Sequence, residues 1–154
     1  MRAEMAVDVS YELAVETDLD FETAERLTRD LLQGEGFGVL TEIDVQQTLG
    51  AKLGVEFRPY KILGACNPHL AHRALEVEPG IGLPLPCNVV IEETGPGRAS
   101  VRFMEPKAAL SWSATPRLSR SRTMLQSGCI GLPRGFSDQT EAGAEERDSL
   151  APGR

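Results

Sequence analysis

Between residues 9 and 104, segments with the apolar period of a strand alternate with segments that have the period of a helix. Strand patterns lie at 9–15, 37–43, 59–65, 85–93 and 99–104, and a helix pattern follows each of the first three. The predicted order is β-α-β-α-β-α-β-β, ending in an antiparallel hairpin around TGPGR (94–98). This order predicts an α/β fold in which helices pack on an α+β mixed sheet.

Polar residues and glycines mark where the first two helices begin and end. Asp18 or Asp20 is placed to cap the first helix, and Gly34 suits its left-handed C-terminal position. Asp44 is placed to cap the second helix, which carries an apolar stripe and is closed by Gly54. The stripe consists of Val45, Leu49 and Leu53.

Charge and composition exclude several classes of protein. The 154 residues carry a net charge of −7, which argues against a nucleic-acid-binding surface. No apolar run approaches the roughly 20 residues that span a bilayer, and no secretory signal is visible. Three cysteines, Cys66, Cys87 and Cys129, do not form a disulfide framework. We therefore expect a cytoplasmic protein with reduced thiols that binds neither nucleic acid nor membrane.

The end of the chain differs from the rest in charge and patterning. Residues 1–110 hold 10 Lys and Arg against 18 Asp and Glu, a net charge of −8, whereas residues 111–154 hold 6 against 5, a net charge of +1. The second part is rich in Ser, Gly, Pro and Arg, and such a composition buries too little apolar surface to offset the entropy of ordering. We predict a domain over 1–110 and a disordered, low-complexity tail over 111–154.

The stretch YKILGACNPHLAHRAL (60–75) gathers reactive and polar side chains. Asn67 is a favoured N-cap and Pro68 suits the first helical position, so both have a structural role at the start of the third helix. Cys66 immediately precedes this helix. Amides at a helix N-terminus lower the pKa of a thiol when its sulfur points toward them.

The two histidines of this stretch, His69 and His72, lie on the polar face of the third helix. The opposite, apolar face consists of Leu70, Ala71, Ala74, Leu75 and Val77. Together with Cys66 the histidines form a Cys-x2-His-x2-His pattern that matches no zinc motif. We therefore expect no metal site here.

A second Cys-Asn pair, Cys87-Asn88, lies at the start of the strand pattern over 85–93. Cys66 and Cys87 are 21 residues apart, about the length of one strand-helix-strand crossover. We expect such a unit to place both thiols at strand ends on the same edge of the sheet. There the pair can form a reversible disulfide or bind a soft ligand, although buried, inert cysteines are the common alternative.

Five short motifs follow one another along the chain: GFGV (36–39), RPY (58–60), GACNP (64–68), AHRAL (71–75) and LPCN (85–88). Taken in this order, they resemble the domain of unknown function 302 family (DUF302). The resemblance implies a small α/β domain that forms a homodimer and has no established activity. Both Cys-Asn pairs, Tyr60 and His72 occupy motif positions, whereas His69 does not.

The residues leave three functions open. In the first, a non-enzymatic homodimer binds a small ligand or senses redox state through Cys66 and Cys87. Its polar surround would be Tyr60, Asn67, Asn88 and His72. In the second, the chain is a thiol-dependent enzyme in which His72 activates Cys66. In the third, it is a purely structural or interaction module. The motifs identify no cofactor.

Overall fold

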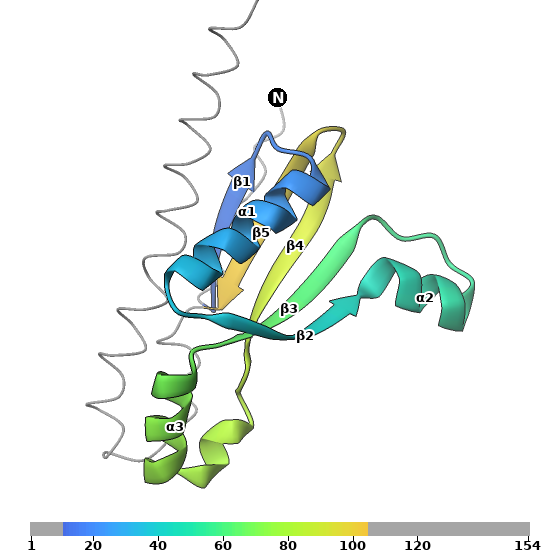
Figure 1. Ribbon diagram of the computed structural model, residues 1–154. Coiled ribbons are helices and arrows are strands. Elements are labelled where there is room, and N and C mark those ends of the chain that lie inside the picture. The colour runs from blue at the N-terminus through green and yellow to red at the C-terminus, as the bar shows by residue number, and fades with distance from the viewer. Residues whose placement is uncertain (1–10, 105–154) are drawn as a thin grey trace, which may run out of the picture.

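The computed structural model describes residues 11–104, and its elements follow the predicted α/β order (Figure 1). The strands are β1 (Glu12–Thr17), β2 (Gly38–Asp44), β3 (Tyr60–Cys66), β4 (Cys87–Gly95) and β5 (Arg98–Met104). The helices are α1 (Phe21–Gly34), α2 (Val45–Leu53), α3 (Pro68–Val77) and the short 3-10 helix η1 (Pro79–Gly82). Among the described residues, no helix is long and apolar enough to cross a membrane. The predicted domain end at residue 110, the tail over 111–154 and Cys129 lie outside this range.

The five strands form one sheet in the order β1-β5-β4-β3-β2, and every pair of neighbours is antiparallel. The crossover expected between the two cysteine-bearing strands is therefore wrong, because it would make β3 and β4 parallel. Antiparallel pairing is what brings the end of β3 beside the start of β4. In a parallel unit, the start of the second strand would lie at the opposite end of the sheet.

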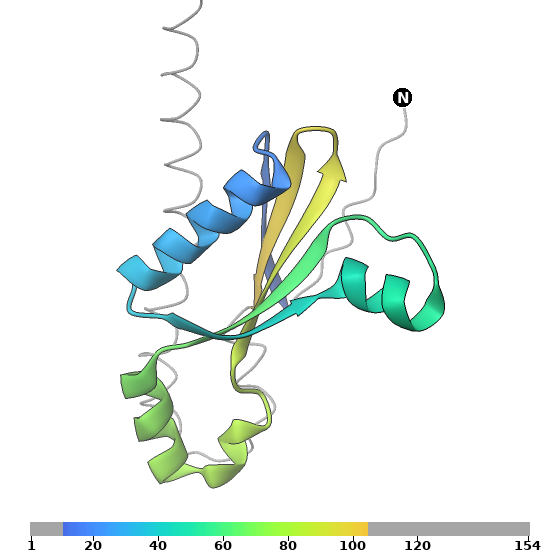
Figure 2. The same cartoon turned by 45° about the vertical axis from the view of Figure 1, so that its right-hand side comes forward.

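The main core lies between α1 and one face of the sheet (Figure 2). Ala24 and Leu32 of α1 pack against the inward side chains of β3, β4 and β5. These side chains are Leu63, Ala65, Val89, Ile91, Ala99, Val101 and Phe103. Each large apolar side chain buried in this way contributes roughly 1.5–3 kcal/mol to the free energy of folding.

The predicted N-cap of α1 is confirmed, whereas the predicted left-handed residue at its C-terminus is not. The Asp20 carboxylate accepts a hydrogen bond from the Thr23 amide at 2.8 Å, and this bond lowers the pKa of Asp20. At the other end, the Glu35 amide still donates to the Leu31 carbonyl at 3.1 Å, so the helical turn continues past Gly34. The left-handed residue is Gly36, with φ of 80°. The prediction that placed it at Gly34 is wrong by two residues.

The helices α2 and α3 extend away from the sheet instead of covering it (Figures 1 and 2). The predicted limits of α2 are confirmed, since Asp44 accepts from the Gln47 amide at 2.8 Å and Gly54 has φ of 65°. Its apolar stripe joins no core, because no residue of α2 is buried and Leu53 is 68% exposed.

The α3 arm, defined as residues 67–86, has a small core of its own. Ala74 of α3 packs against Ile81 of η1 and against Leu85. Leu75, predicted on the apolar face of α3, is 42% exposed. The arm therefore depends mainly on its own contacts and on its two connections to the sheet.

Four charged side chains tie α1 to the strands at the β2 edge; we call them the charged quartet. Lys61 Nζ lies 2.8 Å from Glu25 Oε2 and 3.0 Å from Glu42 Oε1. Arg29 Nη2 lies 2.7 Å from Glu25 Oε1 and also pairs with Glu42. Burial opposes the charge on Lys61, but its hydrogen bonds to Glu25 and Glu42 outweigh burial and raise the pKa of Lys61. The charged quartet links α1, β2 and β3.

Candidate functional site

Three of the sequence motifs meet at one end of the sheet. Gly38 of GFGV pairs in register with Cys66 of GACNP, the last residue of β3. Ala65 lies opposite Cys87, the first residue of β4. The strand ends that carry the two Cys-Asn pairs are thus immediate neighbours, as the sequence predicted.

Two glycines of these motifs, Gly64 and Gly36, lie so close to neighbouring residues that a side chain would not fit there. A Cβ on Gly64 would lie 2.8 Å from Pro86 Cγ and would overlap the Thr41 hydroxyl. Gly36 has a left-handed backbone, and a Cβ there would lie 3.3 Å from Asn67 Nδ2. Residues of the β2, β3 and β4 motifs therefore approach one another more closely than larger side chains would allow.

The amides at the start of α3 are occupied by Asn67. Its Oδ1 accepts hydrogen bonds from the amides of His69 at 3.1 Å and Leu70 at 3.2 Å, which confirms its predicted capping role. Burial, followed by the nearby thiol of Cys87, raises the pKa of Cys66. The sequence left open whether the helix N-terminus lowers the pKa of Cys66; in the structure this pKa is raised, and the side chain of Asn67 takes up the amides of His69 and Leu70.

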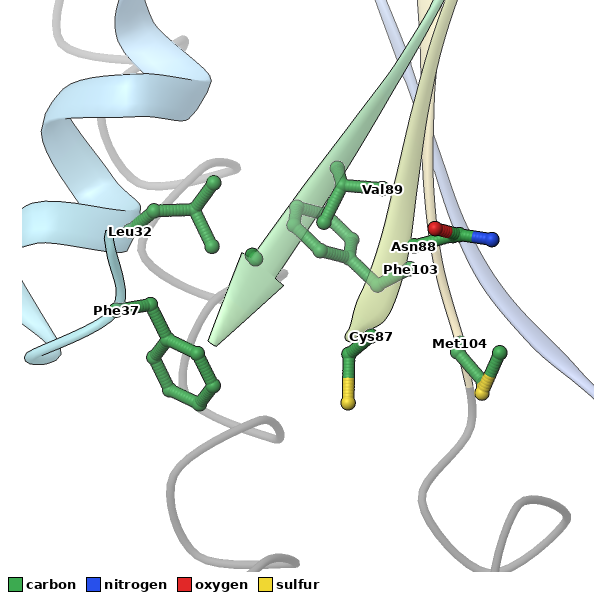
Figure 3. Close-up of a pocket in the computed structure, with 8 residues that line it drawn as sticks. Leu32, Phe37, Cys87, Asn88, Val89, Phe103 and Met104 are labelled. Atoms are coloured by element: carbon green, nitrogen blue, oxygen red, sulfur yellow. The ribbon is translucent and has the colours of Figure 1, made fainter. Parts of the chain in front are cut away.

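Cys87 faces the α1 side of the sheet and lines a small cavity (Figure 3). The cavity has a volume of about 10 Å³ and mostly apolar walls. The apolar walls are Leu32, Phe37, Ala65, Val89 and Phe103. Asn88 also borders it, but the amide of Asn88 points away from Leu32 and Phe37 (Figure 3).

Met104, at the end of β5, also borders the cavity, but its side chain lies on the same side of the strands as Asn88, away from Leu32 and Phe37 (Figure 3). Sequence reasoning did not single it out. The predicted hairpin could have indicated it. Antiparallel pairing of the strand patterns at 85–93 and 99–104 places residue 104 near the start of the 85–93 strand, where Cys87 lies.

Tyr60 lies far from the two cysteines, although it was predicted in the same polar surround. It begins β3 and Cys66 ends it, so the rise per residue separates their Cα atoms by about 20 Å. Tyr60 instead lies opposite Glu92 in the register of β3 and β4. Burial, followed by the charge of Glu92, raises the pKa of Tyr60.

The Arg58 of the RPY motif belongs to a row of charges on the sheet face opposite α1. Arg58 Nη2 lies 2.8 Å from Glu92 Oε2, and Arg102 Nη2 lies 2.7 Å from Glu92 Oε1. Arg102 Nη1 also lies 3.0 Å from Glu12 Oε1. Burial acts to raise the pKa of Glu92, but hydrogen bonds from Arg58 and Arg102 outweigh it and lower that pKa. Arg58 thus anchors the RPY motif to β4.

His72 points into solvent on the polar face of α3. Its side chain is 74% exposed, and Nδ1 lies 3.9 Å from Glu76 Oε2, one helical turn along. Cys66 and Cys87 both carry thiols rather than a disulfide, and both are half-buried. Among the predicted site residues, the structure therefore brings together Cys66, Asn67, Cys87 and Asn88, while Tyr60 and His72 lie elsewhere.

A family model described as a domain of unknown function, DUF302, matches residues 13–127. The chain belongs to the DUF302 family. The match begins in β1 and continues past residue 110. A crystal structure of an uncharacterised conserved DUF302 protein from Bacillus stearothermophilus resembles this chain with a TM-score of 0.74 and 24% identity. That similarity covers 83% of this chain and 99% of the other, and it shows a shared DUF302 fold. No curated protein matches the chain.

Proposed function

We propose that this DUF302 chain is a non-enzymatic module that senses redox state through Cys66 and Cys87. The observation that carries the proposal is the register of β3 and β4, in which Ala65 lies opposite Cys87 and Cys66 is the next residue. Cross-strand spacing and the rise of one residue then put the Cα atoms of the two cysteines about 6 Å apart. Disulfides join residues at such separations.

Alternation along the strands turns the two side chains toward opposite faces of the sheet. Closing a disulfide therefore requires rotation about the backbone or side chain at one of them. Each cysteine is the terminal residue of its strand, so such a rotation disturbs few ladder hydrogen bonds. Within the described residues, the core of the arm is formed by Ala74, Ile81 and Leu85 and is separate from the core of the sheet.

The oxidant in the proposed reaction is a low-molecular-weight disulfide. The thiolate of one cysteine attacks it, which forms a mixed disulfide and releases one small thiol. The second cysteine then attacks the mixed disulfide, releases the second small thiol and forms the Cys66–Cys87 bond. Two protein thiols lose two electrons and two protons, and the small disulfide gains them. The protein functions as a sensor because the reverse exchange restores both thiols.

The thiol-dependent enzyme has less support from the geometry. A nucleophilic cysteine needs a lowered pKa or an adjacent base, whereas the pKa of Cys66 is raised and His72 lies in solvent beside Glu76. The structural-module alternative predicts that neither cysteine takes part in any exchange.

The test uses the full chain with Cys129→Ser, so that only the two candidate thiols are present. After incubation with oxidised glutathione, alkylation with N-ethylmaleimide and intact mass spectrometry count the remaining thiols. We expect loss of both thiols together, with a Cys66–Cys87 cross-link in the non-reduced peptide map. Cys66→Ser and Cys87→Ser should each stop at the mixed disulfide. Two thiols that stay alkylatable under native oxidation would overturn the proposal and favour the structural module.

We also propose that the chain forms a homodimer through β2 and α2. The proposal is supported by apolar side chains exposed along this edge of the sheet. They are Leu40 (67% exposed), Ile43 (48%), Leu53 (68%) and Val55 (46%). β2 is an edge strand, so its outer backbone groups are also open to a partner.

Light scattering after size-exclusion chromatography tests this dimer. The double variant Ile43→Glu, Leu53→Glu should shift the mass toward one chain, because charge is excluded from the core of such interfaces. Leu83→Glu, on the α3 arm at a site 93% exposed, is the matched control and should keep the wild-type mass. A wild-type protein that stays monomeric at high concentration contradicts the proposal.

A further inference from the structure

We propose that formation of the Cys66–Cys87 disulfide removes the N-cap of α3, so that the start of the α3 arm responds to oxidation. The proposal rests on the redox function above and identifies the element that changes when the disulfide forms. Its basis is the position of the cap, because Asn67, whose side chain caps α3, is the residue directly after Cys66.

Cys66 is the cysteine that can turn, because Cys87 is held more firmly. Pro86, the residue before Cys87, packs against Gly64, where a Cβ would lie 2.8 Å from Pro86 Cγ. Cys87 itself lies opposite Ala65 in the ladder and lines the cavity on the α1 side. Turning Cys87 to the other face would disrupt the packing of Pro86 and enlarge a cavity among apolar side chains, which costs stability.

A turn at Cys66 meets little resistance. Ala65 lines the cavity, so by alternation Cys66 faces the side of the sheet away from α1, and its sulfur must cross to the α1 side to reach Cys87. The cavity beside Cys87 has about the size of one water molecule and provides space for the incoming sulfur. The pair of Cys66 with Gly38 is the last one in the β2–β3 ladder, so few strand hydrogen bonds oppose the turn.

The turn at Cys66 reorients Asn67, because the two residues share a peptide bond. In the reduced chain, Asn67 Oδ1 accepts hydrogen bonds from the amides of His69 at 3.1 Å and Leu70 at 3.2 Å. Both bonds require the chain to enter the helix through the extended backbone that Asn67 has here. We therefore expect both to break when Cys66 changes face. The first turn of α3 is sensitive to this loss, since the helix has only 10 residues.

Thermodynamic linkage provides the test. If oxidation removes the cap, removing the cap beforehand makes oxidation more favourable, because only the reduced state then loses stability. Asn67→Ala should therefore raise the equilibrium constant for Cys66–Cys87 formation with oxidised glutathione about fivefold, which corresponds to an N-cap of about 1 kcal/mol. Asn67→Ser, which keeps a capping oxygen, should have the wild-type constant.

Asp44→Ala is the matched control. It removes the cap of α2, at the opposite end of β2 from the cysteines, and should leave the constant unchanged. All variants carry Cys129→Ser and are equilibrated with mixtures of reduced and oxidised glutathione. Acid quenching and intact mass spectrometry then give the fraction of disulfide, and circular dichroism verifies that each variant is folded.

Hydrogen exchange followed by NMR gives a second readout that needs no change at the cap. The amides of His69 and Leu70 should exchange about fivefold faster in the oxidised than in the reduced Cys129→Ser chain. Equal equilibrium constants for folded Asn67→Ala and the parent chain, or equal exchange in the two redox states, would overturn the uncapping and leave the redox function in place. A chain that never forms the disulfide would overturn both.

Discussion

At the scale of single residues, Gly64 is a position where β3 has no room for a side chain between β2 and the residue that precedes β4. Its missing side chain leaves room for Thr41 on one neighbouring strand and for Pro86 just before the other. Both contacts involve short, stiff side chains close to the backbone, so an added methyl group cannot be accommodated by a flexible neighbour. The GACNP motif therefore needs glycine here for packing, independently of the chemistry of Cys66.

We predict that Gly64→Ala lowers the free energy of unfolding by about 2 kcal/mol or more, as expected for overpacking a buried site. Urea unfolding followed by circular dichroism measures the change. Gly34→Ala is the control, because a Cβ there meets nothing within 4 Å and no positive φ is involved. It should be neutral or stabilising by up to about 1 kcal/mol. Equal effects of the two substitutions would contradict the packing role of Gly64.

At the scale of elements, the charged quartet holds the edge strand β2 to the rest of the fold. Glu25 on α1 and Lys61 on β3 have side chains only 15% and 16% exposed, whereas Glu42 on β2 is 45% exposed. Hydrogen bonds from Lys61, and then from Arg29, lower the pKa of Glu42. The attachment of β2 should therefore depend on pH.

The sign follows from the direction of that shift. The pKa of Glu42 in the folded chain lies below its ordinary value of 4.5, so the unfolded chain binds the proton first as pH falls. The stabilisation is complete above that value and is lost as pH falls through the lower, folded pKa. We predict that Glu42→Gln has lower stability than wild type at about pH 7 and a flatter loss of stability toward about pH 3.

Urea unfolding at a series of pH values measures how steeply the free energy of unfolding depends on pH in wild type and in Glu42→Gln. Glu56→Gln, at an exposed glutamate between α2 and β3, serves as the control and should follow the wild-type slope. Parallel curves for wild type and Glu42→Gln would show that the charged quartet does not stabilise the folded chain through Glu42.

The elements themselves were predictable because their signals are local. Asp20, Asp44, Asn67 and Gly54 cap or end helices through contacts within a few residues, and all four do so in the structure. Strand pairing depends on distant segments, so the sequence did not distinguish a crossover from the antiparallel return of β4. The exposure of α2 was also missed, because an apolar stripe predicts a buried face without saying what buries it.

At the scale of the whole molecule, the candidate site brings together two cysteines that the sequence indicated, beside a cavity that also borders a methionine that the sequence did not single out. Cys66 and Cys87 were recognisable because each opens a Cys-Asn pair at the end of a strand pattern. Met104 has no such local mark and comes to the cavity only through the pairing of β4 with β5. Tyr60 and Cys66 are close in sequence, but they lie at opposite ends of β3. Closeness in sequence therefore did not predict closeness in space here.

We predict that oxidation of Cys66 and Cys87 stabilises the chain by up to about 3 kcal/mol, because the new bond restricts the unfolded chain over the 20 residues between them. The urea midpoints of the oxidised and reduced Cys129→Ser protein measure this difference. Cys66→Ser, treated in the same way, should show no shift. An oxidised protein that unfolds at lower urea would mean that strain at the strand ends exceeds the gain in entropy.

The α3 arm has a consequence for how this fold can vary. It leaves the sheet after Cys66 and returns at Cys87, two positions that the ladder already holds side by side. The sheet therefore does not need the arm to close its own connection, and a short reverse turn between β3 and β4 would complete the same hairpin. The arm is in effect an insertion in a tight turn, so the register of the sheet and the packing of the α1 core do not depend on its length.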